Sequence, residues 1–221
     1  MSNNESQPDP SSNSAPESSF IVLLSWVDYV TLSSVVTTSL AVSFALEGRL
    51  FLATALLFLA MLADACDGIL ARKYGLVRAF GRYLDGFMDV LIYLVTPSII
   101  WYLSGFSGWY GVFLMIMIAT GCIRLSVFNE VGNIEESDGL SYLGMPVFWS
   151  VFILAVSQLL SLLLPATLLF VLLAITLSIF SCCMLYRGRF FKFKSMKQIY
   201  AITLGGASIF LLIDLYYFIQ A

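Results

Sequence analysis

Four aspartates recur at helical spacing in an otherwise apolar part of the sequence: Asp64, Asp67, Asp85 and Asp89. Residues three or four positions apart lie on one face of a helix, so each pair can present its carboxylates in one direction. Two helices carrying such faces can place the two pairs opposite one another. A carboxylate at a central membrane position costs about 2.5–3.5 kcal/mol, and neighbouring carboxylates also repel one another. The cluster therefore requires cations and contact with water.

The composition limits which bases and which cations are available. The chain has no histidine, which removes the usual general base and most zinc sites. Carboxylate oxygens favour Mg²⁺ or Mn²⁺, and a cluster of several carboxylates suits a site for two ions. We therefore expect two divalent ions, Mg²⁺ or Mn²⁺, as cofactors at the aspartates.

Two glycines and an arginine accompany the aspartates at fixed distances along the chain. Gly68 and Gly81 leave the helix surface bare, so a diphosphate can approach closely. Arg72 offers a planar fork of donors to a phosphoryl oxygen. The alternative is a set of polar helix ends at a membrane interface, with the basic residues acting as anchors. The number of elements at helical spacing favours the chemical site.

The elements that carry these residues are membrane helices. Of the 221 residues 60% are hydrophobic and only 11% are charged, whereas soluble domains have about 25% charged residues. Apolar stretches of about 20 residues, enough to cross ~30 Å of hydrocarbon, recur along the chain. We expect an all-α integral membrane protein, a bundle of six to seven transmembrane helices with a cytoplasm-facing polar cavity. The helices are predicted at residues 29–46, 51–72, 82–103, 109–128, 145–163, 166–186 and 199–219.

Basic residues predict the orientation, because they collect on the cytoplasmic side of membrane proteins. With two basic loops inside, the N-terminus is inside, the C-terminus is outside and the aspartates face the cytoplasm. Arg49 is then the only basic residue on the far side, and Asp214, near the end of the last helix, receives no role. A bacterial or archaeal inner membrane is favoured over an organelle membrane. The two basic groups are Arg72, Lys73, Arg78 and Arg82, and Arg187, Arg189, Lys192, Lys194 and Lys197.

Residues 1–19 differ from the rest of the chain in composition. They are rich in Ser, Asn and Pro and carry acidic but no basic residues, which predicts a disordered tail. No basic segment precedes the first apolar stretch, so we expect that stretch to be retained rather than cleaved as a signal. Residues 20–221 are predicted to form one membrane domain, with a short interfacial segment at residues 20–28 as one alternative. Its four cysteines lack paired spacing and predict no disulfide.

The residues from Asp64 to Asp89 follow the pattern D-x2-D-G-x2-A-R-x8-G-x3-D-x3-D. This pattern resembles the signature of the CDP-alcohol phosphatidyltransferase family without a departure. The resemblance implies a membrane enzyme, usually a homodimer, that replaces CMP on a CDP-linked lipid by an alcohol hydroxyl. It implies that the four aspartates hold two metal ions and that Asp89 is also the base. Gly68 and Gly81 would lie against the nucleotide, with Arg72 on its phosphates.

A second element of that family is Asn-x-x-Thr at the start of the first helix, where it helps to hold the nucleotide. Asp28-Tyr-Val-Thr31 occupies this place, so Asp28 departs from the family pattern. A carboxylate accepts a hydrogen bond from the cytosine amino group but, unlike an amide, it cannot donate one. Asp28 and Thr31 are therefore candidates for nucleotide binding, with a helix N-cap as the alternative for Asp28.

Residues beyond the signature indicate the acceptor alcohol. The segments 123–129 and 142–146 resemble the Arg-Leu-x-x-Phe-Asn and Phe-x-Gly-Leu-Pro motifs of the phosphatidylserine synthase branch. This resemblance implies CDP-diacylglycerol as donor and L-serine as acceptor, with inositol, inositol phosphate, glycerol 3-phosphate or choline as alternatives. Arg124 is the candidate for binding the serine carboxylate, and a snorkelling anchor is its alternative role. A divalent-metal transporter is the competing function, and no nucleic-acid partner is expected.

Overall fold

The chain is helical through nearly all of the part that the structure describes. The computed structural model describes residues 21–131, 142–190 and 196–220. Six helices among these residues are long and apolar enough to cross a membrane, which confirms the predicted all-α integral membrane fold. The predicted tail at residues 1–19 lies outside the described residues, as do Lys192 and Lys194.

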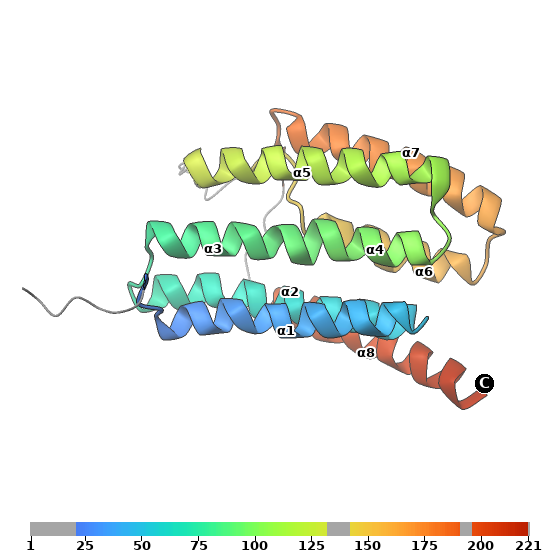
Figure 1. Cartoon of the computed structure of the whole chain (residues 1–221), viewed down its shortest axis with the longest axis horizontal. Coiled ribbons are helices and arrows are strands. Elements are labelled where there is room, and N and C mark those ends of the chain that lie inside the picture. Colours follow the sequence, from blue (N-terminus) through green and yellow to red (C-terminus); the bar gives the residue numbers. More distant parts are fainter. Residues whose placement is uncertain (1–20, 132–141, 191–195, 221) are drawn as a thin grey trace, which may run out of the picture.

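Figure 1 shows the elements coloured from blue to red along the chain. The helical elements are α1 (Trp26–Leu46), α2 (Leu50–Lys73), α3 (Ala79–Asp89), the π-helical segment η1 (Val90–Val95), α4 (Thr96–Leu103), the 3₁₀ turn η2 (Gly108–Tyr110), α5 (Gly111–Val131), α6 (Trp149–Ser161), α7 (Ala166–Leu185) and α8 (Met196–Gln220). Two short strands, β1 (Tyr142–Leu143) and β2 (Arg189–Phe190), form an antiparallel pair.

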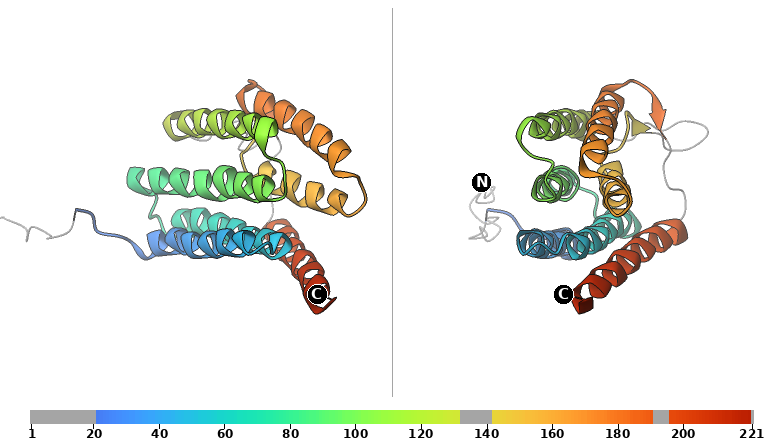
Figure 2. Two further views of the ribbon diagram at one scale, coloured as in Figure 1. Left: turned by 45° about the vertical axis from the view of Figure 1, so that its right-hand side comes forward. Right: turned by 90° about the vertical axis from the view of Figure 1, so that its right-hand side faces the viewer.

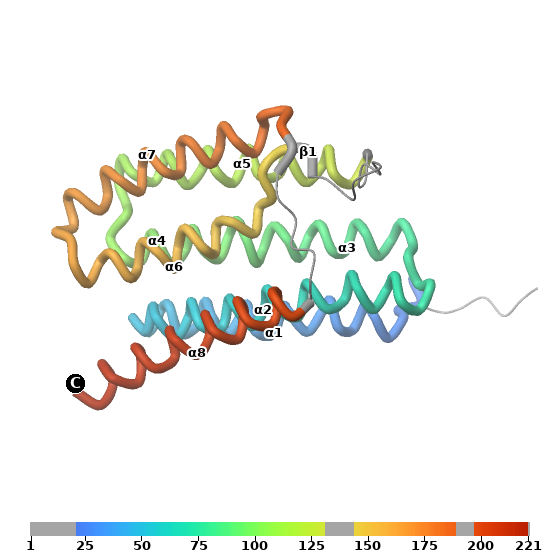
Figure 3. The backbone as a smooth tube through the Cα atoms, turned by 180° about the vertical axis from the view of Figure 1, so that it is seen from behind, coloured from blue at the N-terminus to red at the C-terminus, as the bar shows by residue number. Residues whose placement is uncertain are grey.

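The helices form three tiers in the view of Figure 1. Helix α1 packs against α2, which also contacts α8; the continuous helix from α3 to α4 lies above them, and α5 lies above that and packs against α7. The two further views of Figure 2 show the same grouping. Seen from behind in Figure 3, α6, α7 and α8 lie mainly beside the half of the bundle that contains α4. The other half, which contains α3, is formed mainly by α1, α2, α3 and α5.

Helix α6 is shorter than the predicted helix at residues 145–163. It has 13 residues, about 20 Å at 1.5 Å per residue, which is less than the ~30 Å thickness of a hydrocarbon core. The chain before it is not helical: it bends at Gly144, which has a positive φ of 78°, and the backbone N–H of Met145 donates to the carbonyl of Cys183 at 3.0 Å. Non-helical backbone at membrane depth requires such protein partners. The segment before α6 is therefore held by the end of α7.

The third predicted helix is interrupted by the π-helical segment η1. Pro97 is the second residue of α4. A proline lacks the N–H that bonds to the carbonyl four residues earlier, and its ring clashes with that carbonyl. That carbonyl belongs to Tyr93, inside η1, so Pro97 accounts for the wider turn. The sequence predicted one uninterrupted helix here, and π segments within α-helices are frequent at functional sites.

Helix α1 begins at Trp26, three residues before its predicted start at residue 29. The cause is a capping box in which the Ser25 side chain accepts from the N–H of Asp28 and the Asp28 side chain accepts from the N–H of Ser25. Such a box satisfies two backbone donors that a helix start leaves open. Residues 26–28 are thus the first turn of α1, and no separate interfacial helix forms among the described residues before it.

Arg49 and Asp214 join α2 to α8 at the beginning of α2. Asp214, on α8, forms an ion pair with Arg49, which is the N-cap residue of α2. The other oxygen of Asp214 accepts a hydrogen bond from the N–H of Leu52 at 3.3 Å, so it satisfies one of the open donors of the helix start. The Arg49 guanidinium also lies 4.9 Å from the ring centroid of Phe218. Asp214 therefore has a structural partner that the sequence alone did not indicate.

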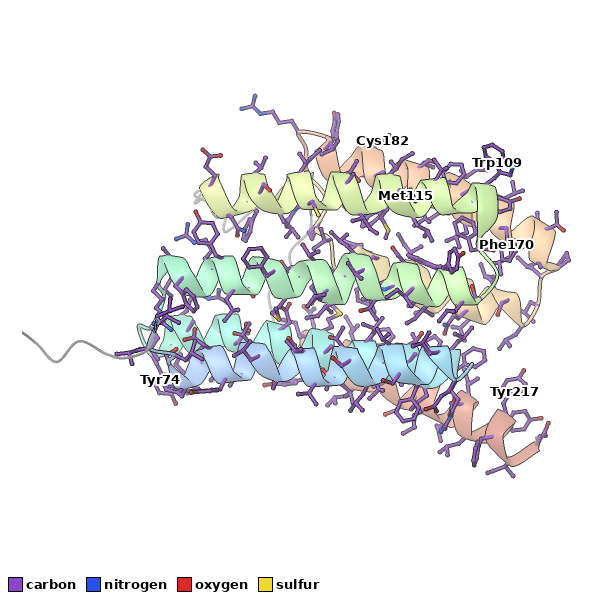
Figure 4. All side chains as sticks on the ribbon, viewed as in Figure 1. Tyr74, Trp109, Met115, Phe170, Cys182 and Tyr217 are labelled. Carbon is purple, nitrogen blue, oxygen red and sulfur yellow. The ribbon has the colours of Figure 1, made fainter. Side chains whose placement is uncertain are left out.

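Aromatic side chains lie at both ends of the bundle. Figure 4 shows Tyr74 at one end and Trp109 and Tyr217 at the other, where amphipathic rings suit the membrane–water interface. Trp101 differs, because it is 1% exposed and its indole N–H donates to the hydroxyl of Ser157 at 2.9 Å. Trp101 is therefore part of the core between α4 and α6.

Candidate metal centre

Three of the four predicted ligands come together between α2 and α3. Asp64 and Asp67 lie in the C-terminal half of α2, and Asp85 lies in α3. One carboxylate oxygen from each of the three lies within 4.8 Å of the others. Asp67 is buried, whereas Asp64 and Asp85 are half-buried. The helical spacing in the sequence has thus become a compact acidic group that is shared by two helices.

Two oxygens of this group have no hydrogen-bond partner among the described residues. They are Oδ1 of Asp64 and Oδ2 of Asp67, and both are buried. Buried carboxylate oxygens are almost always hydrogen-bonded, because leaving them unpaired costs free energy. Three close carboxylates with free lone pairs fit a hard divalent cation such as Mg²⁺ or Mn²⁺. Asp64, Asp67 and Asp85 are therefore the residues of this chain that could hold such an ion.

The fourth aspartate, Asp89, is not a member of the compact group. It is half-buried and lies four residues after Asp85, at the end of α3. It is close enough to Asp64, to Asp85 and to Arg124 of α5 to interact with each electrostatically. Asp89 thus lies near the three grouped carboxylates and also near the positively charged Arg124.

Tyr93 belongs to the site although the sequence analysis did not select it. Its side chain is 3% exposed, and its hydroxyl donates a hydrogen bond to Oδ2 of Asp64 at 2.6 Å. Tyr93 lies four residues after Asp89, which itself lies four residues after Asp85. This continued spacing was the signal in the sequence that could have identified it.

The two glycines of the motif have room for a larger side chain. A Cβ atom on Gly68 would lie 3.6 Å from the nearest atom, a guanidinium nitrogen of Arg72, and one on Gly81 would lie 3.7 Å from Arg78. Both are ordinary van der Waals distances, so packing inside the chain does not require glycine here. Arg72 is exposed and interacts electrostatically with Asp67 and Asp85. The bare surfaces and the guanidinium therefore lie beside the acidic group.

Gly121 contrasts with the motif glycines. A Cβ atom there would lie 2.5 Å from a methyl carbon of Leu94, and Leu94 is fully buried in η1. Here the absence of a side chain is required by the contact between α5 and η1. The fold therefore requires glycine at position 121, whereas at positions 68 and 81 the described residues leave the space beside it open.

Asp28 and Thr31 lie on α1, beside the acidic group. Asp28 is buried, forms an ion pair with Arg78, and would have one oxygen 3.8 Å from a Cβ atom on Gly81. It is the third residue of α1 in the capping box, so Ser25 rather than Asp28 is the N-cap. The hydroxyl of Thr31 donates to the carbonyl of Val27 at 3.3 Å, and Thr31 also interacts with Asp67.

Arg124 approaches the acidic group from α5. It is 6% exposed, its guanidinium lies 5.1 Å from the ring centroid of Phe128, and it interacts electrostatically with Asp89. A snorkelling anchor keeps its charged head in water or among lipid head groups. Arg124 is instead buried, within electrostatic reach of Asp89.

The sequence model of the CDP-alcohol phosphatidyltransferase family matches residues 26–220. The chain belongs to this family. The match covers every described helix from α1 to α8, so the acidic group, the motif glycines and the buried Arg124 all lie inside the CDP-alcohol phosphatidyltransferase domain. Members of this family use divalent metal ions, in agreement with the donor set of Asp64, Asp67 and Asp85.

Individual relatives within the CDP-alcohol phosphatidyltransferase family carry serine in their names. The archaetidylserine synthase of Methanothermobacter thermautotrophicus is 30% identical over 133 residues, which are 58% of this chain and 54% of the relative. The CDP-diacylglycerol–serine O-phosphatidyltransferase of Methanocaldococcus jannaschii is 30% identical over 120 residues, 54% of this chain and 53% of the relative. The Bacillus subtilis protein of that name is 31% identical over 121 residues, 53% of this chain and 66% of the relative. The chain thus spans about half to two thirds of the length of these curated relatives.

Proposed function

We propose that the chain transfers the phosphatidyl group of CDP-diacylglycerol to the hydroxyl of a small alcohol, with L-serine as the preferred acceptor. The observation that carries this proposal is the acidic group of Asp64, Asp67 and Asp85, in which two buried oxygens lack hydrogen-bond partners within the described part of the chain, in a chain of the CDP-alcohol phosphatidyltransferase family. A purely structural carboxylate would be expected to have its oxygens paired. In this site, Oδ1 of Asp64 and Oδ2 of Asp67 are instead available to a ligand.

Each side chain has a role that follows from its surroundings. Asp64, Asp67 and Asp85, with Asp89 at their edge, would hold two divalent ions, Mg²⁺ or Mn²⁺. When bound, the ions supply positive charge that neutralises the diphosphate as CMP departs. Gly68 and Gly81 leave space for the nucleotide, and Arg72 donates hydrogen bonds to its phosphates. Asp28 and Thr31, on the neighbouring surface of α1, would bind the nucleotide as well.

Asp89 is the proposed general base. Its carboxylate accepts the proton of the acceptor hydroxyl as the hydroxyl oxygen forms a bond to the lipid-side phosphorus. The bond from that phosphorus to the oxygen that bridges to CMP breaks, and CMP leaves with the bonding electron pair. The location of Asp89 beside the compact group, rather than within it, supports a role in proton transfer in addition to metal binding.

Serine as acceptor is supported by the relatives and by Arg124. The names of the relatives from M. thermautotrophicus, M. jannaschii and B. subtilis all specify serine. The serine carboxylate requires a cation, and Arg124 is buried within electrostatic reach of Asp89. An acceptor bound to Arg124 through its carboxylate would therefore lie near the proposed base.

We also propose that the site faces the cytoplasm of a bacterial or archaeal inner membrane and that the protein is a homodimer. Exposed Arg72 and Lys73 at the end of α2 nearest the site support the orientation, because basic residues are retained on the cytoplasmic side. Light scattering of the detergent-solubilised protein checks the dimer. Modification of single cysteines placed beside Lys73, in intact and in opened cells, checks the orientation.

A panel of acceptors tests the function. Purified protein receives CDP-diacylglycerol, Mg²⁺ or Mn²⁺, and one of serine, inositol, inositol phosphate, glycerol 3-phosphate or choline, and the release of CMP is measured. Serine is expected to give the fastest release. Faster release with another alcohol would retain the reaction and change the acceptor. Transport of divalent ions into vesicles without any CMP release would contradict the proposed reaction.

A further inference from the structure

Tyr93 is buried beside the acidic group, although it lies outside the signature that runs from Asp64 to Asp89. Its hydroxyl donates to Oδ2 of Asp64 at 2.6 Å, which is short for a bond between two oxygens and typical of a charge-assisted one. The other oxygen of the same carboxylate, Oδ1, is buried without a hydrogen-bond partner among the described residues. The two oxygens of Asp64 are therefore not equivalent.

This asymmetry decides which oxygen is available to a cation. We propose that Tyr93 is a positioning residue for the metal centre: its phenol holds Asp64 by Oδ2 and so presents Oδ1 to the divalent ion. The inference rests on the proposed metal site. Partners in the outer shell of a metal centre fix the orientation of the ligands, and their loss typically weakens metal binding by about 10–100-fold.

The backbone around Tyr93 is built to fix its direction. Tyr93 lies within η1, where the helix widens from α to π geometry ahead of Pro97, and a π turn directs its side chains differently from an α turn. The next residue, Leu94, is fully buried and packs against Gly121 of α5 so closely that a Cβ atom there would lie 2.5 Å from it. The packing of Leu94 against α5 therefore fixes the turn of the helix that carries Tyr93, whose phenol contacts Asp64.

A tyrosine that only fills the core would behave differently from a positioning residue. Its hydroxyl could be removed with some loss of stability, but metal affinity would not change selectively. A positioning residue predicts a change in metal affinity that is larger than any change in the stability of the metal-free protein. These two properties can be measured separately.

Tyr93→Phe is the test, because it removes one oxygen atom and keeps the ring. Tyr102→Phe is the matched control, since Tyr102 lies on α4 of the same continuous helix and is 56% exposed. The dissociation constant for Mn²⁺ is measured by the electron paramagnetic resonance signal of free Mn²⁺, and the thermal midpoint is measured without metal. Tyr93→Phe is expected to weaken Mn²⁺ binding by about 10–100-fold and to raise the Mn²⁺ concentration required for half-maximal CMP release. Tyr102→Phe should match the wild type in both.

The outcomes separate this inference from the proposed function. Equal Mn²⁺ affinity in the wild type and in folded Tyr93→Phe would overturn the role of Tyr93 alone. If the wild type binds no Mn²⁺ that is lost in Asp64→Asn, the metal site fails and the role of Tyr93 fails with it. Should Tyr93→Phe not fold, Tyr93→Met provides a second variant, which also removes the hydroxyl donor and keeps an apolar side chain. Mn²⁺ affinity in folded Tyr93→Met equal to that of the wild type would contradict the inference, and affinity weakened by about tenfold or more would support it.

Discussion

Carboxylates have opposite surroundings in the two halves of α2. At its beginning, Asp214 reaches over from α8, and both of its oxygens are engaged, one by Arg49 and the other by the N–H of Leu52. Towards its end, Asp64 and Asp67 face Asp85, and each of the α2 pair keeps one buried oxygen without a hydrogen-bond partner among the described residues.

We expect this difference to separate a structural charge from a functional one. A buried charge is tolerated when it is paired and hydrogen-bonded, and Asp214 meets both conditions. The three carboxylates within 4.8 Å of one another are only partly hydrogen-bonded, and they repel one another in the absence of a cation. The paired acid should therefore contribute to stability, and the grouped acids should contribute to activity at the expense of stability.

The largest effect is expected when the charge of a grouped aspartate is removed. Asp64→Asn should lower the rate of CMP release by at least about 10³-fold, because the divalent ions contribute several kcal/mol of charge stabilisation in the transition state. Relief of like-charge repulsion should leave the metal-free thermal midpoint unchanged or higher. Both quantities are measured on the same purified sample, and a variant that retains a tenth of the wild-type rate would contradict the functional role.

Removal of the proposed base should have the next largest effect. Asp89→Asn should lower the rate of CMP release by about 100-fold or more, the range for loss of a general base. Since Asp64, Asp67 and Asp85 are unchanged, Mn²⁺ should still bind to these three residues in the variant, and only an ion that also uses Asp89 should bind more weakly. Near-normal turnover in Asp89→Asn would exclude Asp89 as the base.

The paired acid should show the reverse behaviour. Asp214→Asn removes the charge that Arg49 requires and is expected to lower the free energy of unfolding by about 2–3 kcal/mol. This lies below the ~3–5 kcal/mol typical of a broken buried pair, because the Arg49 side chain is 30% exposed. The rate per folded molecule should stay near that of the wild type. A large loss of rate with unchanged stability would break the contrast between the two halves of α2.

Substitutions of two glycines are expected to have the smallest effects, and they test the same difference between a functional and a structural position. Gly68→Ala should fold as stably as the wild type, since its Cβ atom has 3.6 Å of space, but should lower kcat/KM for CDP-diacylglycerol by roughly tenfold, about 1.4 kcal/mol of transition-state binding. Gly121→Ala should instead lower the free energy of unfolding by about 1–3 kcal/mol through overpacking against Leu94. Thermal midpoints and kinetics of both variants check this, and a destabilised Gly68→Ala with unchanged kinetics would argue against a ligand beside position 68.

Much of this architecture could be predicted from the sequence, because it is encoded locally. Apolar stretches of membrane-spanning length predicted the long helices, and the three- and four-residue spacing predicted that Asp64 and Asp67 share a face opposite Asp85. The glycines at positions 48, 105 and 108, which have positive φ, lie in the gaps between the helices predicted at residues 29–46 and 51–72 and at residues 82–103 and 109–128.

Features that depend on tertiary contacts were not predicted. The partner of Asp214 is Arg49, 165 residues away, and no local pattern joins them. The short α6 depends on backbone hydrogen bonds between the segment after Gly144 and the end of α7. The contact between Tyr93 and Asp64 joins the π-helical segment that precedes Pro97 to α2, and it forms only when these helices are packed together.

The central claim is that the grouped carboxylates act through bound divalent ions, and removal of the ions tests it most directly. Purified protein is stripped with excess chelator, CMP release from CDP-diacylglycerol and serine is measured, and Mg²⁺ or Mn²⁺ is then added back. We expect release to stop in the chelator and to return with either ion in the wild type, but not in Asp64→Asn. Undiminished CMP release in the stripped protein would contradict the account.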